Sequence, residues 1–139
     1  MFFYVKKNLL SYNIMNFKYI VSKIPTKQLY NVNIYKDITK FGNMNFQIHN
    51  DSAILNNLWV DEPKKGHGTK IINQFENYVK FKYDTKQIKL LAWQPQGCTN
   101  VLDFYCKNGY TEKEMLKMNY DDGILIYDLY RFEKNINNY

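Results

Sequence analysis

The stretch Leu58-Trp59-Val60-Asp61-Glu62-Pro63-Lys64-Lys65-Gly66-His67-Gly68-Thr69-Lys70-Ile71-Ile72 decides the fold, because it predicts a strand, a glycine loop and a helix in that order. Leu58 to Val60 favour a β-strand, and Pro63 ends it because proline has no amide hydrogen for a strand ladder. Two glycines one residue apart then permit a tight turn. The apolar residues that follow have the period of an amphipathic helix: Ile71, Ile72, Phe75, Tyr78 and Val79. The polar residues among them are predicted to face solvent: Lys70, Asn73, Glu76, Asn77 and Lys80.

The first turn of this helix predicts an anion site. Its leading amides have no intrahelical partner, and glycines at positions 66 and 68 let a ligand approach the backbone closely. Three lysines add positive charge around the loop: Lys64, Lys65 and Lys70. We expect the amides between Gly66 and Lys70 to surround a phosphate, although a helix N-terminus without a ligand fits so short a motif equally well.

Two better-known phosphate loops do not match this stretch. The nucleotide-hydrolase pattern G-x-x-x-x-G-K-[ST] requires a glycine five residues before Gly68, where the chain has Pro63. The dinucleotide pattern G-x-G-x-x-G requires a third glycine at the position of Ile71. The loop is therefore assigned to neither class.

The rest of the chain predicts one domain, 1–139, of the α/β (α+β) class. Alternating and β-rich segments predict strands at 17–24, 29–35, 44–49, 53–60, 88–93, 110–115 and 123–132, with a turn at Phe41-Gly42-Asn43. Thr99 is a suitable N-cap for a second helix over 100–108, and Gly109 ends it. The expected sheet is mixed and mostly antiparallel, with six or seven strands and a central βαβ unit. Residues 1–15 are expected to be an edge strand or a poorly ordered leader.

Composition restricts the possible partners. The 139 residues are 45% hydrophobic and 17% aromatic, which excludes intrinsic disorder and suits one domain with a substantial core. The net charge of +6 favours an anionic partner, and nucleic acid, an anionic membrane and a polyphosphate cofactor all qualify. The cysteines and histidines lack metal-ligand spacing, so no metal and no disulfide framework is expected. With no apolar run of membrane-spanning length, we expect a soluble, cytoplasmic protein in a reducing compartment, without a membrane partner.

The glycine loop and the second helix together resemble the GNAT superfamily of N-acetyltransferases. Gly66-His67-Gly68 matches the G-x-G of that family's coenzyme loop, [RQ]-x-x-G-x-[GA], whose first position falls here on Pro63. The second helix matches the family pattern F-Y-x-x-x-G-[FY] at Phe104, Tyr105, Gly109 and Tyr110. A polar residue of that pattern falls on Cys98, with Asn100 close by. With the predicted strands, the resemblance covers 17–132 and implies a GNAT-like acyl-CoA N-acyltransferase fold.

The resemblance implies transfer of an acetyl group from the co-substrate acetyl-CoA to a primary amine by direct attack. It implies that the strand backbone pairs with the pantetheine arm, that an N–H near Val60 polarises the thioester carbonyl, and that Tyr105 is the general acid. The residues that would contact the coenzyme are Leu58, Trp59, Val60, Lys64, Lys65, Gly66, His67, Gly68, Thr69, Lys70, Asn100 and Tyr105. In a chain with 13 tyrosines, Tyr105 also fits a half-buried aromatic residue of a helix.

The acceptor side is less defined by the sequence. Glu62, with Asp61 beside it, is the candidate general base that would deprotonate the amine. Asp121 and Asp122 lie in a turn that often lines the acceptor pocket of such folds, and they fit a solvated hairpin turn as well. The connection at 25–28 is too short for the acceptor-binding helices that family members often place there. The acceptor side is therefore expected to be open or to be completed by a second subunit, in a monomer or a homodimer.

Two other functions remain open from the sequence. A basic nucleic-acid-binding domain would use tyrosines to stack bases and lysines to meet phosphates. It explains the charge but not the two motifs, so nucleic acid is the less favoured partner. A catalytically inactive acyl-CoA-binding protein of the same fold would explain both motifs without chemistry.

Overall fold

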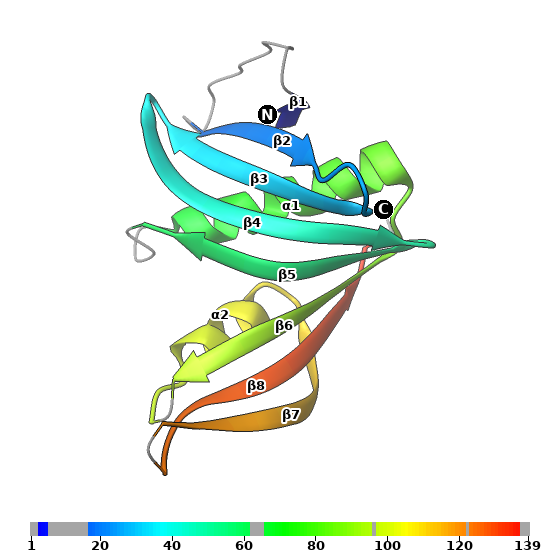
Figure 1. The fold of residues 1–139 in the computed structure, drawn as a ribbon. Helices are drawn as coiled ribbons and strands as arrows, with labels where there is room; N and C mark the ends of the chain where they lie inside the picture. Colours follow the sequence, from blue (N-terminus) through cyan, green and yellow to red (C-terminus); the bar gives the residue numbers. More distant parts are fainter. Residues whose placement is uncertain (1–2, 6–16, 62–65, 96, 122, 137–139) are drawn as a thin grey trace.

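The computed structural model describes residues 3–5, 17–61, 66–95, 97–121 and 123–136 (Figure 1). The elements are β1 (Phe3–Val5), β2 (Phe17–Lys23), β3 (Leu29–Lys36), β4 (Thr39–His49), β5 (Ser52–Val60), α1 (His67–Tyr83), β6 (Gln87–Pro95), α2 (Asn100–Lys107), β7 (Thr111–Asp121) and β8 (Ile124–Asn135). Seven strands correspond to those predicted, and β1 adds a short eighth at the edge of the sheet. The predicted α/β class is confirmed. Neither described helix is both long and apolar enough to cross a membrane.

All strands belong to one mixed sheet with the order β1-β2-β3-β4-β5-β6-β8-β7. The strands from β2 to β5 form an antiparallel meander, because each is joined to the next by a short turn. β5 and β6 run parallel, and α1 is the crossover between them, which is the predicted βαβ unit. β6, β8 and β7 are antiparallel.

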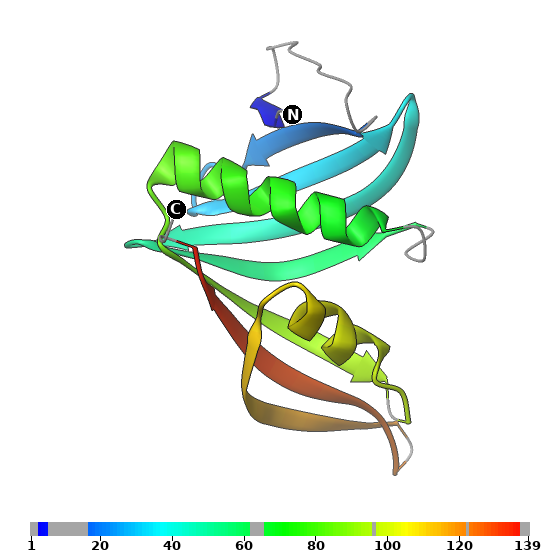
Figure 2. The ribbon, with the colours of Figure 1, turned by 180° about the vertical axis from the view of Figure 1, so that it is seen from behind.

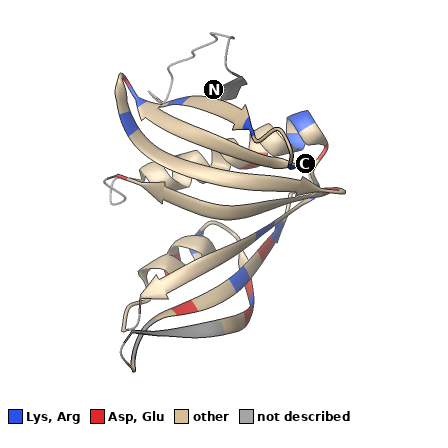
Figure 3. Ribbon diagram, viewed as in Figure 1, with Lys and Arg blue, Asp and Glu red and all other residues tan. Residues whose placement is uncertain are grey.

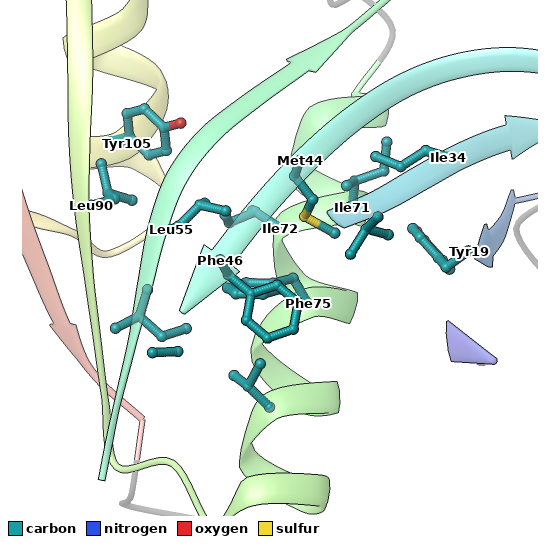
Figure 4. Packing of buried hydrophobic residues seen from close by; sticks show 14 of the residues in the cluster. Tyr19, Ile34, Met44, Phe46, Leu55, Ile71, Ile72, Phe75, Leu90 and Tyr105 are labelled. Atoms are coloured by element: carbon teal, nitrogen blue, oxygen red, sulfur yellow. The ribbon is translucent and has the colours of Figure 1, made fainter. Parts of the chain in front are cut away.

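Both helices cover the same face of the sheet (Figure 2). The strands turn alternate side chains toward α1, and these pack against the apolar stripe of the helix (Figure 4). The ring of Phe46 on β4 meets that of Phe75 on α1 edge-on, with centroids 5.2 Å apart. Burying each such side chain contributes roughly 1.5–3 kcal/mol. The fully buried residues of this core include Tyr19, Val32, Ile34, Met44, Phe46, Ile71, Ile72, Phe75, Val79 and Ile88.

The predicted turn at Phe41-Gly42-Asn43 is wrong, because these residues lie inside β4. The chain reverses earlier, where Asp37 has the left-handed φ of 57°. Gly42 has a packing role instead: a Cβ there would lie 2.4 Å from the carbonyl oxygen of Trp59 on the neighbouring strand. The glycine permits a close approach of two backbones rather than a turn.

The prediction that Glu76 faces solvent is also wrong, since only 5% of the residue is exposed. Its carboxylate accepts hydrogen bonds from Tyr110 Oη at 2.8 Å and from Lys134 Nζ at 2.9 Å. Lys134 Nζ also donates to the carbonyl oxygen of Asn108 at 2.9 Å. These partners offset the cost of burying the charge, and they join α1, the end of α2 and β8. Helical periodicity could not show partners so distant in the chain.

Candidate active site

The sheet splits between β5 and β6. The two strands pair only from Ser52 opposite Gln87 to Leu55 opposite Leu90. Both continue beyond that point, β5 to Val60 and β6 to Pro95, and the two parts of the sheet diverge there (Figure 1). The last residues of β5 therefore keep β4 as a partner on one side and present an unpaired backbone edge to the split.

A β-bulge coincides with the start of the split. Asn45 lies opposite Asn57 and Phe46 opposite Leu55, so Asn56 is an extra residue in β5. A bulge bends the strand that carries it and increases its twist, which turns the end of β5 away from β6. No residue pattern of the sequence indicated this feature, because a bulge is defined by the partner strand.

Amides of β5 point into the split. The amide of Asp61 donates to the carbonyl oxygen of Phe41 on β4 at 2.7 Å. Successive amides of an extended strand point to opposite sides, so the amides of Val60 and Leu58 are directed toward the split. The side chains of Leu58 and Val60 pack toward the core, whereas that of Trp59 is 47% exposed.

The N-terminus of α1 is uncapped. Gly66 is the N-cap with a φ of 75°, it makes no side-chain cap, and the first turn holds no acidic residue. The first intrahelical bond runs from the amide of Lys70 to the carbonyl oxygen of Gly66 at 3.2 Å. Within the described parts of the chain, the amides of Gly68 and Thr69 have no hydrogen-bond partner. A Cβ on Gly66 would meet no described atom within 4 Å, so the described residues leave room for a ligand beside this N-cap.

Gly68 has a second role that the loop pattern did not indicate. A Cβ there would lie 3.0 Å from Cε1 and 3.1 Å from Cζ of Phe104 on α2. The glycine therefore lets the ring of Phe104 pack on the first turn of α1. Asn108 Nδ2, at the other end of α2, donates to Thr69 Oγ1 at 3.3 Å. These contacts hold α2 against the first turn of α1.

His67 is a packing residue in this structure. Its partly buried ring meets the ring of Phe41 edge-on at 5.0 Å and that of Phe17 at 5.4 Å. These contacts fix the first residue of α1 against β2 and β4.

Tyr105 projects from α2 toward β5, with its hydroxyl group leading (Figure 4). The residue is 7% exposed, and its ring lies against Tyr110 and Phe132 with centroids 5.7 and 5.6 Å away. Its hydroxyl group makes no hydrogen bond to any residue that the structure describes. Burial raises the pKa of Tyr105 to about 12, because the phenolate would lose its hydration. The side chain is thus a proton donor, not a base, at neutral pH.

Gln94 caps α2 from the neighbouring strand. It is 2% exposed, and its Oε1 accepts hydrogen bonds from the amides of Val101 at 2.8 Å and Leu102 at 3.1 Å. Its Nε2 donates to Asn100 Oδ1 and to the carbonyl oxygen of Pro95, both at 3.1 Å. Because every polar atom of the buried amide is used, Gln94 fixes the start of the helix that carries the tyrosine.

The N-cap residue Thr99 was predicted correctly, but it does not perform the capping. Its hydroxyl donates to Asp103 Oδ2 at 2.9 Å and makes no bond to a helix amide. One signal could have identified Gln94: it continues the inward register of Ile88, Leu90 and Ala92 in β6 directly before a helix.

Several predicted site residues lie outside the described residues: Glu62, Lys64, Lys65 and Asp122. Asp121 ends β7, and its side chain is likewise not described. Asp61 and Lys70 are exposed at either end of the loop. The structure thus brings together the β5 edge, the start of α1 and Tyr105, and it leaves the predicted base and acceptor residues untested.

The described residues also include a cavity away from the split and two free thiols. A cavity of about 300 Å³ lies near the first residue of β6, at the end of that strand opposite the split, and it is lined by Gln87, Gly109, Thr111, Lys113, Glu133, Lys134 and Asn135. Both thiols, Cys98 and Cys106, are exposed and not linked to each other. No group of three or more His, Cys, Asp or Glu side chains suited to a metal ion occurs in the described part of the chain.

No protein-family model matches the sequence, and no curated protein matches it either. Solved structures of acetyltransferases do match, one of them a GNAT family member, and this chain therefore has the GNAT fold. One is a GNAT family acetyltransferase from Elizabethkingia anophelis with acetyl-CoA bound; it has a TM-score of 0.67 and 13% identity, over 88% of this chain and 99% of that one.

Two further structures extend the comparison. An acetyltransferase from Bacillus subtilis in complex with CoA has a TM-score of 0.59 and 16% identity, over 78% of each chain. The spermidine/spermine N-acetyltransferase SpeG from Vibrio cholerae has a TM-score of 0.64 and 15% identity, over 78% of this chain and 65% of that one. At these identities the similarity concerns the fold, so the chemistry must be argued from the residues of the split.

Proposed function

We propose that this protein transfers the acetyl group of acetyl-CoA to a primary amine by direct attack. The observation that carries the proposal is the split itself, where the unpaired edge of β5 runs beside the uncapped start of α1 and the hydroxyl group of the largely buried Tyr105. The acetyl-CoA in the Elizabethkingia structure and the CoA in the Bacillus subtilis structure support the choice of coenzyme.

The split suits an extended coenzyme. The amide groups of a pantetheine arm can pair with the free edge of β5 as an added strand would. The pyrophosphate then meets the amides of Gly68 and Thr69, where the positive end of the helix dipole adds about 0.3–1 kcal/mol per charge. Lys70 is exposed beside these amides, and Lys64 and Lys65 stay predicted contributors.

The chemical step requires a donor at the thioester oxygen. When the amine attacks the carbonyl carbon, negative charge develops on that oxygen, and a preorganised N–H stabilises it. The amide of Val60 points into the split and supplies such a donor. Asp61 and Glu62 follow it directly and stay the proposed groups for deprotonating the incoming ammonium.

Tyr105 is the proposed acid that protonates the leaving thiolate. A thiol ordinarily has a pKa near ~8.5, so a phenol with a pKa of about 12 would be a poor proton donor to its thiolate in water. The sulfur departs within the same buried site, where desolvation raises the thiol pKa as well. The pKa values of the phenol and of the thiol are then both raised. Proton transfer to the sulfur therefore depends on the position of the Tyr105 hydroxyl group.

A direct test combines coenzyme binding with turnover. Purified protein is titrated with coenzyme A in a calorimeter, and thiol release from acetyl-CoA is followed with a panel of primary amines. We expect saturable binding and amine-dependent thiol release. Binding without release for any amine would instead support the inactive acyl-CoA-binding protein. Retention on single-stranded nucleic acid with a steep salt dependence, and no coenzyme binding, would support the nucleic-acid alternative.

We also propose that the protein acts in the reducing cytoplasm. Its two exposed, unlinked thiols fit a compartment in which cysteines stay reduced.

A further inference from the structure

The face of the sheet opposite the helices carries exposed apolar side chains beside the split. Trp59 on β5 is 47% exposed, Trp93 on β6 is 46%, Tyr127 on β8 is 39% and Leu91 on β6 is 37%. Large apolar groups grouped on one surface indicate a binding site more often than isolated ones do.

Strand register places the two tryptophans on the same face. Trp59 lies opposite Asn43, whose neighbour Met44 is buried in the core against α1. Trp93 lies between Ala92 and Gln94, which are both buried on the helix side. Because side chains alternate along a strand, both indoles are on the face away from the helices, one on each arm of the split.

The indoles lie a short distance beyond the point where the arms separate. The last pair is Leu55 with Leu90. At about 3.3 Å per residue, Trp93 is roughly 10 Å and Trp59 roughly 13 Å further along its strand. Trp93 is also supported by Tyr127, whose ring meets it edge-on at 6.4 Å. The opening on this face thus has an aromatic side chain on each arm.

The charges on the strands around this opening are few. β5 carries no charged residue (Figure 3). On β7 and β8, Arg131 forms ion pairs with Glu114, at 3.1 Å, and with Glu133. Asp61, which directly follows β5, forms no ion pair with a described residue. Outside these ion pairs, the described surface offers the carboxylate of Asp61 and several aromatic rings, a combination suited to a single ammonium on an apolar body.

The connection between β2 and β3 does not cover this face of the sheet. β2 and β3 are joined by a turn, in which the amide of Lys27 donates to Ile24 at 3.1 Å and the amide of Ile24 donates to Leu29 at 2.9 Å. A turn of this length adds no helix that could cover the outer face of the neighbouring strands.

From these observations we infer that the acceptor is a small primary monoamine with an aromatic body, bound against Trp93 and Trp59 on the open face of the split. The inference rests on the proposed acetyl transfer. The amine nitrogen forms a bond to the acetyl carbon, the carbon–sulfur bond breaks, and its electron pair leaves on sulfur. The bound ammonium loses one proton to a base before the attack, and the nitrogen loses a second proton once it is bonded to the acetyl carbon. The sulfur gains one proton, so the products are the N-acetylated amine, coenzyme A and one released proton.

The test compares two classes of amine. Thiol release is measured with phenethylamine and tryptamine and, in parallel, with putrescine and spermidine, which carry several charges and no ring. We expect kcat/KM to be about tenfold or more higher for the aromatic amines. Trp93→Ala should raise KM for tryptamine about five- to tenfold with little change in kcat. Trp93→Phe should recover most of the loss.

The control is another exposed aromatic residue. Phe81 on α1 is 93% exposed, and Phe81→Ala should leave KM unchanged. A preference for spermidine would overturn the inference while leaving acetyl transfer intact, whereas no turnover with any amine would overturn the proposed function itself. If Trp93→Ala leaves KM unchanged and converts a dimer to a monomer in light scattering, the face is an interface between copies and the inference fails.

Discussion

A Cβ on Gly68 of α1 would lie 3.0 Å from Cε1 of Phe104 on α2, so a larger residue at position 68 would require the phenyl ring to move. The contact joins the turn that would hold the pyrophosphate to the residue beside Tyr105. One glycine therefore sets both the phosphate site and the position of the proposed acid, since a shift of α2 would move the tyrosine hydroxyl.

Gly68→Val should lower the free energy of unfolding by about 1–3 kcal/mol, because the added methyl groups overlap the phenyl ring. The measurement is urea unfolding of a double-mutant cycle with Phe104→Ala. In the Phe104→Ala background the same valine should cost less, since the ring is gone. Strict additivity of the two changes would show that the contact has no energetic role.

Gly66→Ala tests the phosphate site more cleanly. The left-handed φ of 75° costs an alanine about 1 kcal/mol, but a Cβ there meets no atom of the described residues. A bound phosphate would meet it, so coenzyme affinity should fall by more than the loss of stability accounts for. Calorimetric titration with coenzyme A measures this.

Gly123 provides the matched control for Gly66. It has a φ of 81° and also meets nothing within 4 Å, in the turn between β7 and β8. Gly123→Ala should lose similar stability and keep its affinity for coenzyme A. If the two variants bind coenzyme A with equal affinity, the phosphate is not bound at the start of α1.

Tyr105→Phe should lower kcat by about 10² to 10⁴ with coenzyme affinity nearly unchanged, because a positioned acid contributes only to the chemical step. Since burial raises the pKa of Tyr105 to about 12, the wild-type hydroxyl stays protonated between pH 8 and its pKa. The kcat of the wild type should therefore show no loss near pH 10, where an ordinary tyrosine titrates.

Steady-state kinetics from pH 7 to 11 check both statements. Tyr110→Phe is the contrasting variant, because its hydroxyl donates to buried Glu76. It should lose stability and retain kcat. If the Tyr105→Phe variant is fully active, Tyr105 is not the general acid.

Local patterns predicted the order of the elements. The alternation in β3, the β-preferring residues at the end of β5, the helical period of α1 and the two glycines of the loop are all encoded within a few neighbouring residues. The same is true of the start and end of α2, at Thr99 and Gly109. The βαβ unit was therefore predictable from the sequence.

Features defined by a distant partner could not be predicted. Gly42 was predicted to lie in a turn. Its packing role could not be predicted, because the carbonyl of Trp59 that approaches it lies on another strand. Glu76 was predicted to face solvent, because its ion-pair partner Lys134 follows it by 58 residues and no local pattern indicates the pair. The bulge at Asn56, which coincides with the split, is visible only in the register of β5 against β4.

Gln94 on β6 and the N-cap residue Thr99 could each stabilise the start of α2, and substitutions of the two residues distinguish these possibilities. Gln94→Leu should lower the free energy of unfolding by about 1–3 kcal/mol, since the amides of Val101 and Leu102 lose their acceptor in a partly buried place. Hydrogen exchange of those two amides should accelerate, and kcat should fall as α2 shifts. Thr99→Ala removes only the bond to Asp103 and should cost less than about 0.5 kcal/mol. If Thr99→Ala proves the more destabilising change, the N-cap residue, not the strand, holds the start of α2.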